Sequence, residues 1–282
     1  MIRNALNFVT AFAIIFFIFV LAKPGGGFND FLLMMSAAAA FIFGIFIAFA
    51  LSNSHDRLNK VNELLKIEDA NMLLIYKMSE NFGKEANDKV RDLIDAHLID
   101  QIDYRLEDFD HSRKSHHKLY EFLISQQPKG KSQEISLEEI ARVLSESSQN
   151  RIHIEAIVKQ SLSKYEWVSI WALTFVVLAT LYQMSNGGLF NAILLTVLAS
   201  ASLLLVLVLR DYDNLKWQKD AWTWKPLHNL FHDLGLVPYY PRRIVEIKEA
   251  RIPEGDKVRL ANYPNPYPDM TDKVVKEEIY GG

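Results

Sequence analysis

Residues 31–51 read FLLMMSAAAAFIFGIFIAFAL, which is 21 consecutive residues without Asp, Glu, Lys or Arg. A helix needs about 20 mainly apolar residues to cross the hydrocarbon core of a bilayer. Three other charge-free stretches of similar length occur in the chain of 282 residues, at 5–22, 168–184 and 189–209. The sequence therefore predicts an all-α integral membrane protein with four transmembrane helices in a lipid bilayer.

The four apolar stretches form two pairs separated by a charged insert, which predicts a 2+2 arrangement. We expect a first transmembrane pair at 1–52, a cytoplasmic helical stalk at 53–165, a second pair at 166–209, an amphipathic Trp-rich segment at 210–237 and an extended C-terminal tail at 238–282. The insert has 17 basic and 20 acidic residues. It therefore presents no basic field of the kind that collects nucleic acid, and we expect no nucleic-acid partner.

The positions of the basic residues predict the orientation in the membrane. With four spans, Arg3, the insert and everything from Arg210 onward lie on one side, and they hold 30 of the 31 basic residues; only Lys23 lies on the other side. By the positive-inside rule both termini and the insert are cytoplasmic, in a multi-pass protein of the cell inner (plasma) membrane. An alternative is that residues 1–22 form a cleaved signal peptide, which would leave three spans.

Helical periodicity continues through the insert. No proline and only one glycine, Gly44, occur in residues 31–82, so a single helix can cross the bilayer and continue about 45 Å beyond it, at 1.5 Å per residue. Further amphipathic helices are predicted at 90–106 and at 113–127, and another from Ser136 into the third span. The insert is thus expected to be a helical stalk.

The region after the fourth span leaves two readings open. Trp217, Trp222 and Trp224 follow the span closely, which is typical of an interfacial helix on the membrane surface. The same segment can instead pack against the stalk. In the tail we expect a short strand at 244–247 and an extended or disordered stretch at 263–268, which is rich in proline and tyrosine.

A row of small residues at four-residue spacing marks a helix-packing face in the second span. Its members are Ser36, Ala40, Gly44, Ala48 and Ser52, called the small-residue row below. Small side chains let two membrane helices approach closely where lipid and protein are equally apolar. The row predicts a helix contact, either within one chain or between chains of a homo-oligomer.

The spans offer few groups for transport chemistry. They contain no ionisable residue, which argues against proton-driven pumps, voltage sensors and most ion-coupled transporters. Phe41 can belong to a hydrophobic constriction, and Thr196 and Ser200 share one face of the last span, so these three are candidate pore-lining residues. Lipid-facing aromatic residues and hydrogen bonds between helices are the simpler interpretations.

The sequence predicts no enzyme, no cofactor and no metal site. There is no cysteine, so disulfides, thiolate metal sites and cysteine nucleophiles are excluded. His228 and His232 have a chelating spacing but lack the acidic residue and third ligand of a zinc-protease motif. A second group of candidate ligands is expected to be a solvated turn; it consists of Asp108, Asp110, His111, His116 and His117.

Two short patterns flank the insert. Glu68, Ala70, Leu73, Leu74 and Tyr76 follow the second span, and Arg151, Ile152 and Trp171 precede or enter the third. Together with the arrangement of spans over residues 30–210, these patterns resemble the bestrophin-like domain family of bacterial membrane proteins. The resemblance implies kinship with oligomeric anion channels. The Trp-rich segment and the proline-tyrosine tail depart from it.

Two functions are consistent with these features. The first is a homo-oligomeric membrane protein that forms a pore or ion channel of bestrophin-like type. The second is a membrane-anchored scaffold that recruits a cytoplasmic protein partner through the insert or the tail. Both need the same amphipathic helices, so the sequence leaves the choice open.

Overall fold

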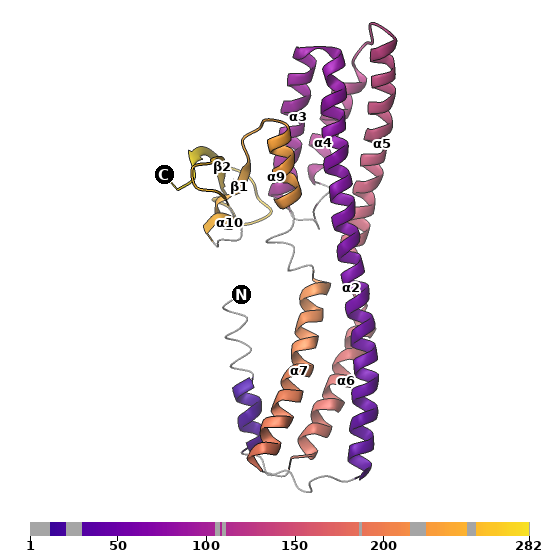
Figure 1. Ribbon diagram of the computed structural model, residues 1–282, viewed down its shortest axis with the longest axis vertical. Helices are drawn as coiled ribbons and strands as arrows, with labels where there is room; N and C mark the ends of the chain where they lie inside the picture. The colour runs from indigo at the N-terminus through magenta and orange to yellow at the C-terminus, as the bar shows by residue number, and fades with distance from the viewer. Residues whose placement is uncertain are drawn as a thin grey trace. The chain divides into compact units, whose positions relative to one another are not determined.

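The structure is a computed structural model that describes residues 12–20, 30–104, 108, 111–185, 188–214, 224–246 and 252–281. The chain divides into two compact units, which are described separately (Figure 1). The apolar unit comprises Met1–Asp56 and Ser161–Asn214, and the polar unit comprises Arg57–Gln160 and Leu215–Gly282.

The apolar unit consists of helices in its described part. Residues 12–20 are helical, and they are followed by the first part of α2 (Asp30–Ser79), α6 (Lys164–Gln183) and α7 (Leu189–Asp213). One residue in three or four along each helix is buried, which is the spacing of one helix face. These residues form one apolar core; examples are Phe19, Phe43, Ile47, Ile170, Leu195 and Ala199.

Three helical segments of the described chain are long and apolar enough to cross a membrane. They lie within Leu33–Phe82, Lys131–Gln183 and Leu189–Asp213, and their apolar windows are only 22%, 28% and 39% buried. An apolar surface this exposed is unfavourable in water and favourable in lipid. The protein is therefore a helical membrane protein. Half of the expected first span, residues 5–11 and 21–22, lies outside the described residues.

The polar unit is built mainly from long helices. It contains the rest of α2, the short 3-10 helix η1 (Glu80–Phe82), α3 (Lys84–Asp103), α4 (Arg113–Ile124) and α5 (Lys131–Lys159). The expected unbroken helix from the second span into the insert is confirmed as α2. Its apolar stripe is buried in the core of this unit, where Met72 and Ile75 pack with Ile94, Leu119 and Leu144.

The expected continuous helix from the insert into the third span is wrong. Residues 160–163 are not helical, and α6 begins afresh at Lys164 with a capping box between Ser163 and Glu166. The carboxylate of Asp213, at the end of α7, accepts hydrogen bonds from Leu162 N (2.8 Å) and Trp167 Nε1 (3.1 Å). The capping box satisfies free N–H groups at the start of α6, and Asp213 holds the non-helical residue before it, so a break is stable here.

The C-terminal region is folded, in contrast to the expected extended tail. It contains α9 (Trp224–Asp233), β1 (Tyr239–Pro241), α10 (Arg242–Glu246), β2 (Lys257–Asn262) and β3 (Val274–Ile279). The strands form a sheet in which β1 is parallel and β3 antiparallel to β2. Residues 244–246, expected in a strand, are helical. All six residues of β3 are exposed.

A buried aspartate joins this sheet to the helices of the polar unit. Asp103, the last residue of α3, accepts hydrogen bonds from the hydroxyl groups of Tyr239 (2.7 Å) and Tyr263 (2.6 Å) and pairs with Lys273. Tyr263 belongs to the stretch expected to be extended or disordered. It is ordered because Asp103 supplies the charged acceptor that its half-buried hydroxyl needs.

Candidate functional site

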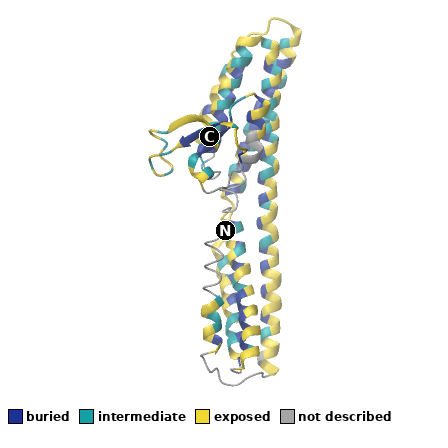
Figure 2. Cartoon of the chain, turned by 60° about the vertical axis from the view of Figure 1, so that its left-hand side comes forward, coloured by how far each residue is buried: buried dark blue, intermediate teal, exposed yellow. Residues whose placement is uncertain are grey.

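The small-residue row lies on an exposed face of α2. Ser36 is half-buried, whereas Ala40, Gly44, Ala48 and Ser52 are exposed, and the apolar part of α2 is mostly yellow in Figure 2. A Cβ atom built on Gly44 would have no heavy atom within 4 Å. The contact of α2 with its own chain uses a different row instead: Ala39, Phe43, Ile47 and Ala50.

The three candidate pore-lining residues occupy two different environments. Phe41 is 69% exposed on α2. Thr196 and Ser200 are buried inside the helix bundle, and Thr196 donates a hydrogen bond to Ala192 O (2.7 Å). Ser200 Oγ has no hydrogen-bond partner among the described residues. The structure therefore does not bring Phe41 together with the other two, and their role in a pore stays a prediction.

The tryptophans proposed for the membrane interface are mostly undescribed. Trp217 and Trp222 lie outside the described residues, and Trp224 is the first residue of α9. The other end of α9 packs in the core of the polar unit, where Leu230 and Phe231 are buried. For this end of the segment, the structure supports the alternative in which it packs against the stalk.

A buried polar network connects four helices of the polar unit, α2, α3, α4 and α5, and Glu68 and Arg151 are its charged members. Glu68 of α2 is 1% exposed, and both its carboxylate oxygens accept from the Ser147 hydroxyl of α5 (2.8 and 2.7 Å). Arg151 Nη1 lies 4.0 Å from Glu68 Oε1, and Nη2 donates to Ser112 Oγ (2.7 Å). Glu68 and Arg151, one residue from each of the two patterns that resemble the bestrophin-like family, thus meet in one site.

Two histidines complete this network, and both are buried. His97 Nε2 accepts from Arg151 Nη1 and Gln101 Nε2, each at 3.0 Å, so the ring proton of neutral His97 is on Nδ1, which is 3.1 Å from Ser115 Oγ. His116 Nε2 lies 3.1 Å from Ser147 Oγ. His116 is therefore part of the core, in contrast to the solvated turn expected from the sequence.

Burial decides the charge states in this network. Desolvation raises the pKa of Glu68, although the positive charge of Arg151 opposes the shift. Desolvation and the charge of Arg151 hold the pKa of His97 well below its ordinary value, and desolvation lowers that of His116 to about 3. Both histidines are neutral at pH 7, so Arg151 is the one permanent cation of the network.

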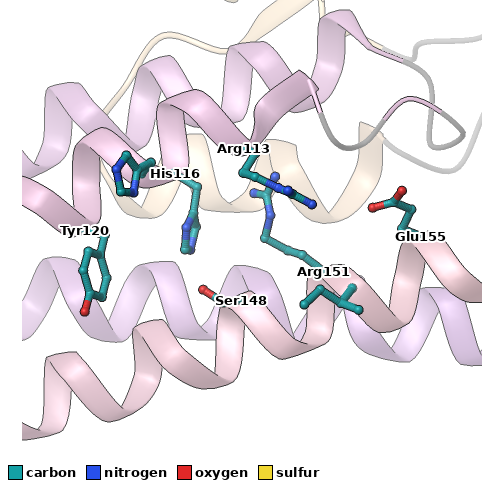
Figure 3. Close-up of a pocket in the computed structure, with 8 residues that line it drawn as sticks. Arg113, His116, Tyr120, Ser148, Arg151 and Glu155 are labelled. Atoms are coloured by element: carbon teal, nitrogen blue, oxygen red, sulfur yellow. The ribbon is translucent and has the colours of Figure 1, made fainter.

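A pocket opens beside the network, between α4 and α5 (Figure 3). Its volume is about 350 Å³. Four lining residues come from each helix: Arg113, His116, His117 and Tyr120 from α4, and Ser148, Arg151, Ile152 and Glu155 from α5. Arg151 and His116 belong to both the network and the pocket, so the network forms part of the pocket wall.

The serine hydroxyl of the network is engaged in an internal hydrogen bond. Ser147 is fully buried and its hydroxyl proton is directed at Glu68, so this hydroxyl cannot reach a substrate as a nucleophile. Within the described part of the chain, no group of three or more His, Asp or Glu side chains is arranged to hold a metal ion. What the site offers is a set of guanidinium, imidazole and hydroxyl donors.

Apolar helices of membrane-spanning length and a folded polar helical unit define the class, an α-helical integral membrane protein. Residues 5–214 match the family described as Bestrophin-like domain. The chain therefore belongs to the bestrophin-like domain family, and the resemblance drawn from the sequence is confirmed. Comparison with curated proteins and with solved structures gives no match.

Proposed function

We propose that this protein is the subunit of a homo-oligomeric membrane channel with four spans per chain, arranged 2+2. The polar unit lies on the cytoplasmic side, together with both termini, because 30 of the 31 basic residues then lie inside. Membership of the bestrophin-like family supports a channel-like role. Charge-free spans fit a pore that conducts passively, because coupled transport needs titratable groups within the membrane.

The exposed small-residue row is the observation that carries this proposal. Lipid chains are as apolar as a leucine side chain, so a membrane helix gains little by exposing alanine and glycine to lipid. The same residues favour a close approach of a second helix. Because α2 packs on its own chain through Ala39, Phe43 and Ile47, the small-residue row is available for the α2 helix of a neighbouring subunit.

Cysteine cross-linking tests this contact, because the chain has no cysteine of its own. Ala48→Cys places a thiol in the small-residue row, and Ile42→Cys places one at another exposed position of α2. Under mild oxidation in membranes we expect most Ala48→Cys protein to migrate as a disulfide-linked dimer and Ile42→Cys to stay largely monomeric. Equal cross-linking of both variants, or a monomer in light scattering of the purified wild type, would contradict the oligomer.

Recordings in planar bilayers test the pore. We expect the purified oligomer to conduct, and we expect Phe41→Ala to raise the unitary conductance because it removes a bulky apolar ring from an exposed face of α2. Phe175→Ala, which removes an equally exposed ring from α6 (72%), is the control and should leave the conductance unchanged. An oligomer without current at every pH and Ca²⁺ concentration tested would refute the pore and leave the oligomer standing.

The alternative function is a membrane-anchored scaffold, and the edge strand β3 favours it. All of its residues are exposed, including Val274 and Ile279 at 50% and 63%. An open strand edge can pair with an extended segment of another protein. This alternative predicts a monomer that passes no current and that loses a co-purifying partner when β3 (Val274–Ile279) is deleted.

A further inference from the structure

We infer that the edge strand β3 pairs with β3 of a second copy of this chain, antiparallel and about a two-fold axis at Glu277. Among the described residues, β3 is the last strand of the sheet and has a neighbour, β2, on one side only. A contact between two identical strand edges is isologous and closes as a dimer. The strand lies outside the residues 5–214 that match the family, so the pairing is independent of the proposed channel.

The backbone of β3 directs hydrogen-bonding groups out of the sheet. Successive residues of an antiparallel strand turn their N–H and C=O groups to opposite sides. Tyr280, directly after β3, donates to Asp256 O (2.9 Å) on the β2 side, so every second residue back from Tyr280 also faces β2. The groups of Val275, Glu277 and Ile279 therefore face outward. These three residues are symmetric about Glu277, so with the axis there each outward N–H and C=O finds a partner in the second copy.

The side chains favour the same register. A two-fold axis normal to the sheet passes between a residue and its own copy. With Glu277 at the axis, Lys276 lies opposite Glu278 of the second copy, and Val275 lies opposite Ile279 of the second copy; both pairs occur twice. Opposite charges and apolar side chains that face each other across two strands stabilise a sheet, whereas like charges destabilise it. A shift of the axis by one residue would instead bring two Lys276 or two Glu278 side chains together.

The ion pairs within one chain are compatible with this contact. Glu277, which meets its own copy at the axis, is paired with Lys257 Nζ of β2 at 2.6 Å, so two ammonium groups flank the two central carboxylates and offset their repulsion. Glu278 accepts from Arg242 at 3.3 Å through Oε2. This exposed pair leaves Oε1 of Glu278 for Lys276 of the second copy.

The charged edge selects a second copy over an arbitrary strand. A lysine on an edge strand usually prevents pairing, because most extended segments place no carboxylate opposite it. The second copy supplies Glu278 opposite each Lys276. The same pairing covers Val275 and Ile279, which are otherwise 42% and 63% exposed, and removal of their apolar surface from water favours the dimer.

Disulfide cross-linking of the full-length protein in membranes tests the contact, because the chain has no cysteine. Glu277→Cys places the thiols of both copies at the axis. The Cα atoms of a hydrogen-bonded antiparallel pair lie about 5.5 Å apart, which is within the range of a disulfide. Asn262→Cys is the matched control, because Asn262 is also exposed but belongs to the central strand β2. We expect the dimer fraction of Glu277→Cys to exceed that of Asn262→Cys about fivefold or more.

Exchange of the charges tests the register. In the Glu277→Cys background we expect Lys276→Glu to lower the dimer fraction about threefold or more, because like charges then lie opposite each other twice. Further addition of Glu278→Lys should restore the dimer. Equal cross-linking of Glu277→Cys and Asn262→Cys, an unchanged dimer fraction in Lys276→Glu, absence of rescue by Glu278→Lys, or a disulfide to a different protein would each overturn the inference. Ala48→Cys reports the α2 contact separately, so a failure here leaves the proposed channel subunit standing.

Discussion

Replacement of Arg151 by methionine is expected to lower the thermal unfolding midpoint of the polar unit by more than about 6 °C. Arg151 is the cation next to the buried carboxylate of Glu68, and it donates to His97 and Ser112. Removal of one partner from a buried ion pair costs about 3–5 kcal/mol. In a unit of this size each kcal/mol shifts the midpoint by about 2–4 °C. Circular dichroism of the detergent-solubilised protein measures the shift.

The destabilisation caused by Arg151→Met should increase with pH. Burial raises the pKa of Glu68, so the folded state favours its protonated form, whereas unfolded Glu68 ionises above its ordinary pKa. Stability therefore falls as the pH rises from that ordinary pKa toward the raised one. Without Arg151 the pKa of Glu68 rises further, and the difference between Arg151→Met and the wild type should be larger at pH 8 than at pH 5. An equal difference at both pH values would contradict this account.

Two further variants separate the buried pair from a general effect of losing an arginine. Arg142 lies on the same helix, but its side chain is 58% exposed and it pairs with Glu139 and Glu146 at the surface. Arg142→Met should leave the unfolding midpoint nearly unchanged, because solvent screens exposed ion pairs. Glu68→Gln combined with Arg151→Met should be more stable than Arg151→Met alone, because no carboxylate is then left buried without its cation.

The helices could be predicted from the sequence because their signals are local. The charge-free run at 31–51 and the absence of proline up to Phe82 correctly predicted α2 as one long helix. The break at 160–163 was missed, although Ser163 and Glu166 form a readable capping pattern. Apolar residues recur at helical spacing on both sides of the break. This periodicity indicates a helical face, but it does not indicate whether one helix or two form that face.

The candidate site could be predicted only in part, because its contacts join distant segments. The pocket-lining residues of α4 and of α5 are visible in the sequence as two helix faces. Their pairing is not, and neither is the contact of Glu68 with Ser147, 79 residues apart. The resemblance to the bestrophin-like family pointed to Glu68 and Arg151 without indicating that they meet.

The sheet of the tail was missed for a different reason. Its first strand has only three residues, Tyr239–Pro241, and pairs in parallel with a strand about 20 residues later. Three residues are too few to show the alternation of apolar and polar side chains that marks a strand. Parallel strands are also not joined by the short turn whose sequence marks a hairpin. Tyrosine and proline indicated extended chain, whereas the tyrosine hydroxyls are ordered by Asp103, more than 130 residues away in the sequence.

Replacement of Asp103 by asparagine is expected to release the C-terminal sheet from α3. Asp103 accepts from two tyrosine hydroxyls and pairs with Lys273. Burial and the charge of Asp103 raise the pKa values of Tyr239 and Tyr263, so both hydroxyls remain protonated donors. Hydrogen bonds to a charged group contribute about 1.5–3 kcal/mol each. With an asparagine carbonyl oxygen in the place of Oδ1, the two tyrosine hydroxyls lose their charged acceptor, and the NH₂ group in the place of Oδ2 faces the ammonium group of Lys273.

Limited proteolysis with mass spectrometry measures this release. A loss of about 3 kcal/mol raises the population of the open form on the order of 100-fold, and we expect cleavage within residues 252–281 to accelerate by a similar factor when opening is fast relative to cleavage. Asp88→Asn is the matched control, because Asp88 lies on the same helix and forms only an exposed pair with Arg91 at 3.4 Å. The cleavage rate of Asp88→Asn should equal that of the wild type.

If Asp103→Asn is cleaved no faster than Asp88→Asn, Asp103 does not hold the sheet. If cleavage accelerates throughout the chain instead of in the tail alone, its role extends to the stability of the whole polar unit.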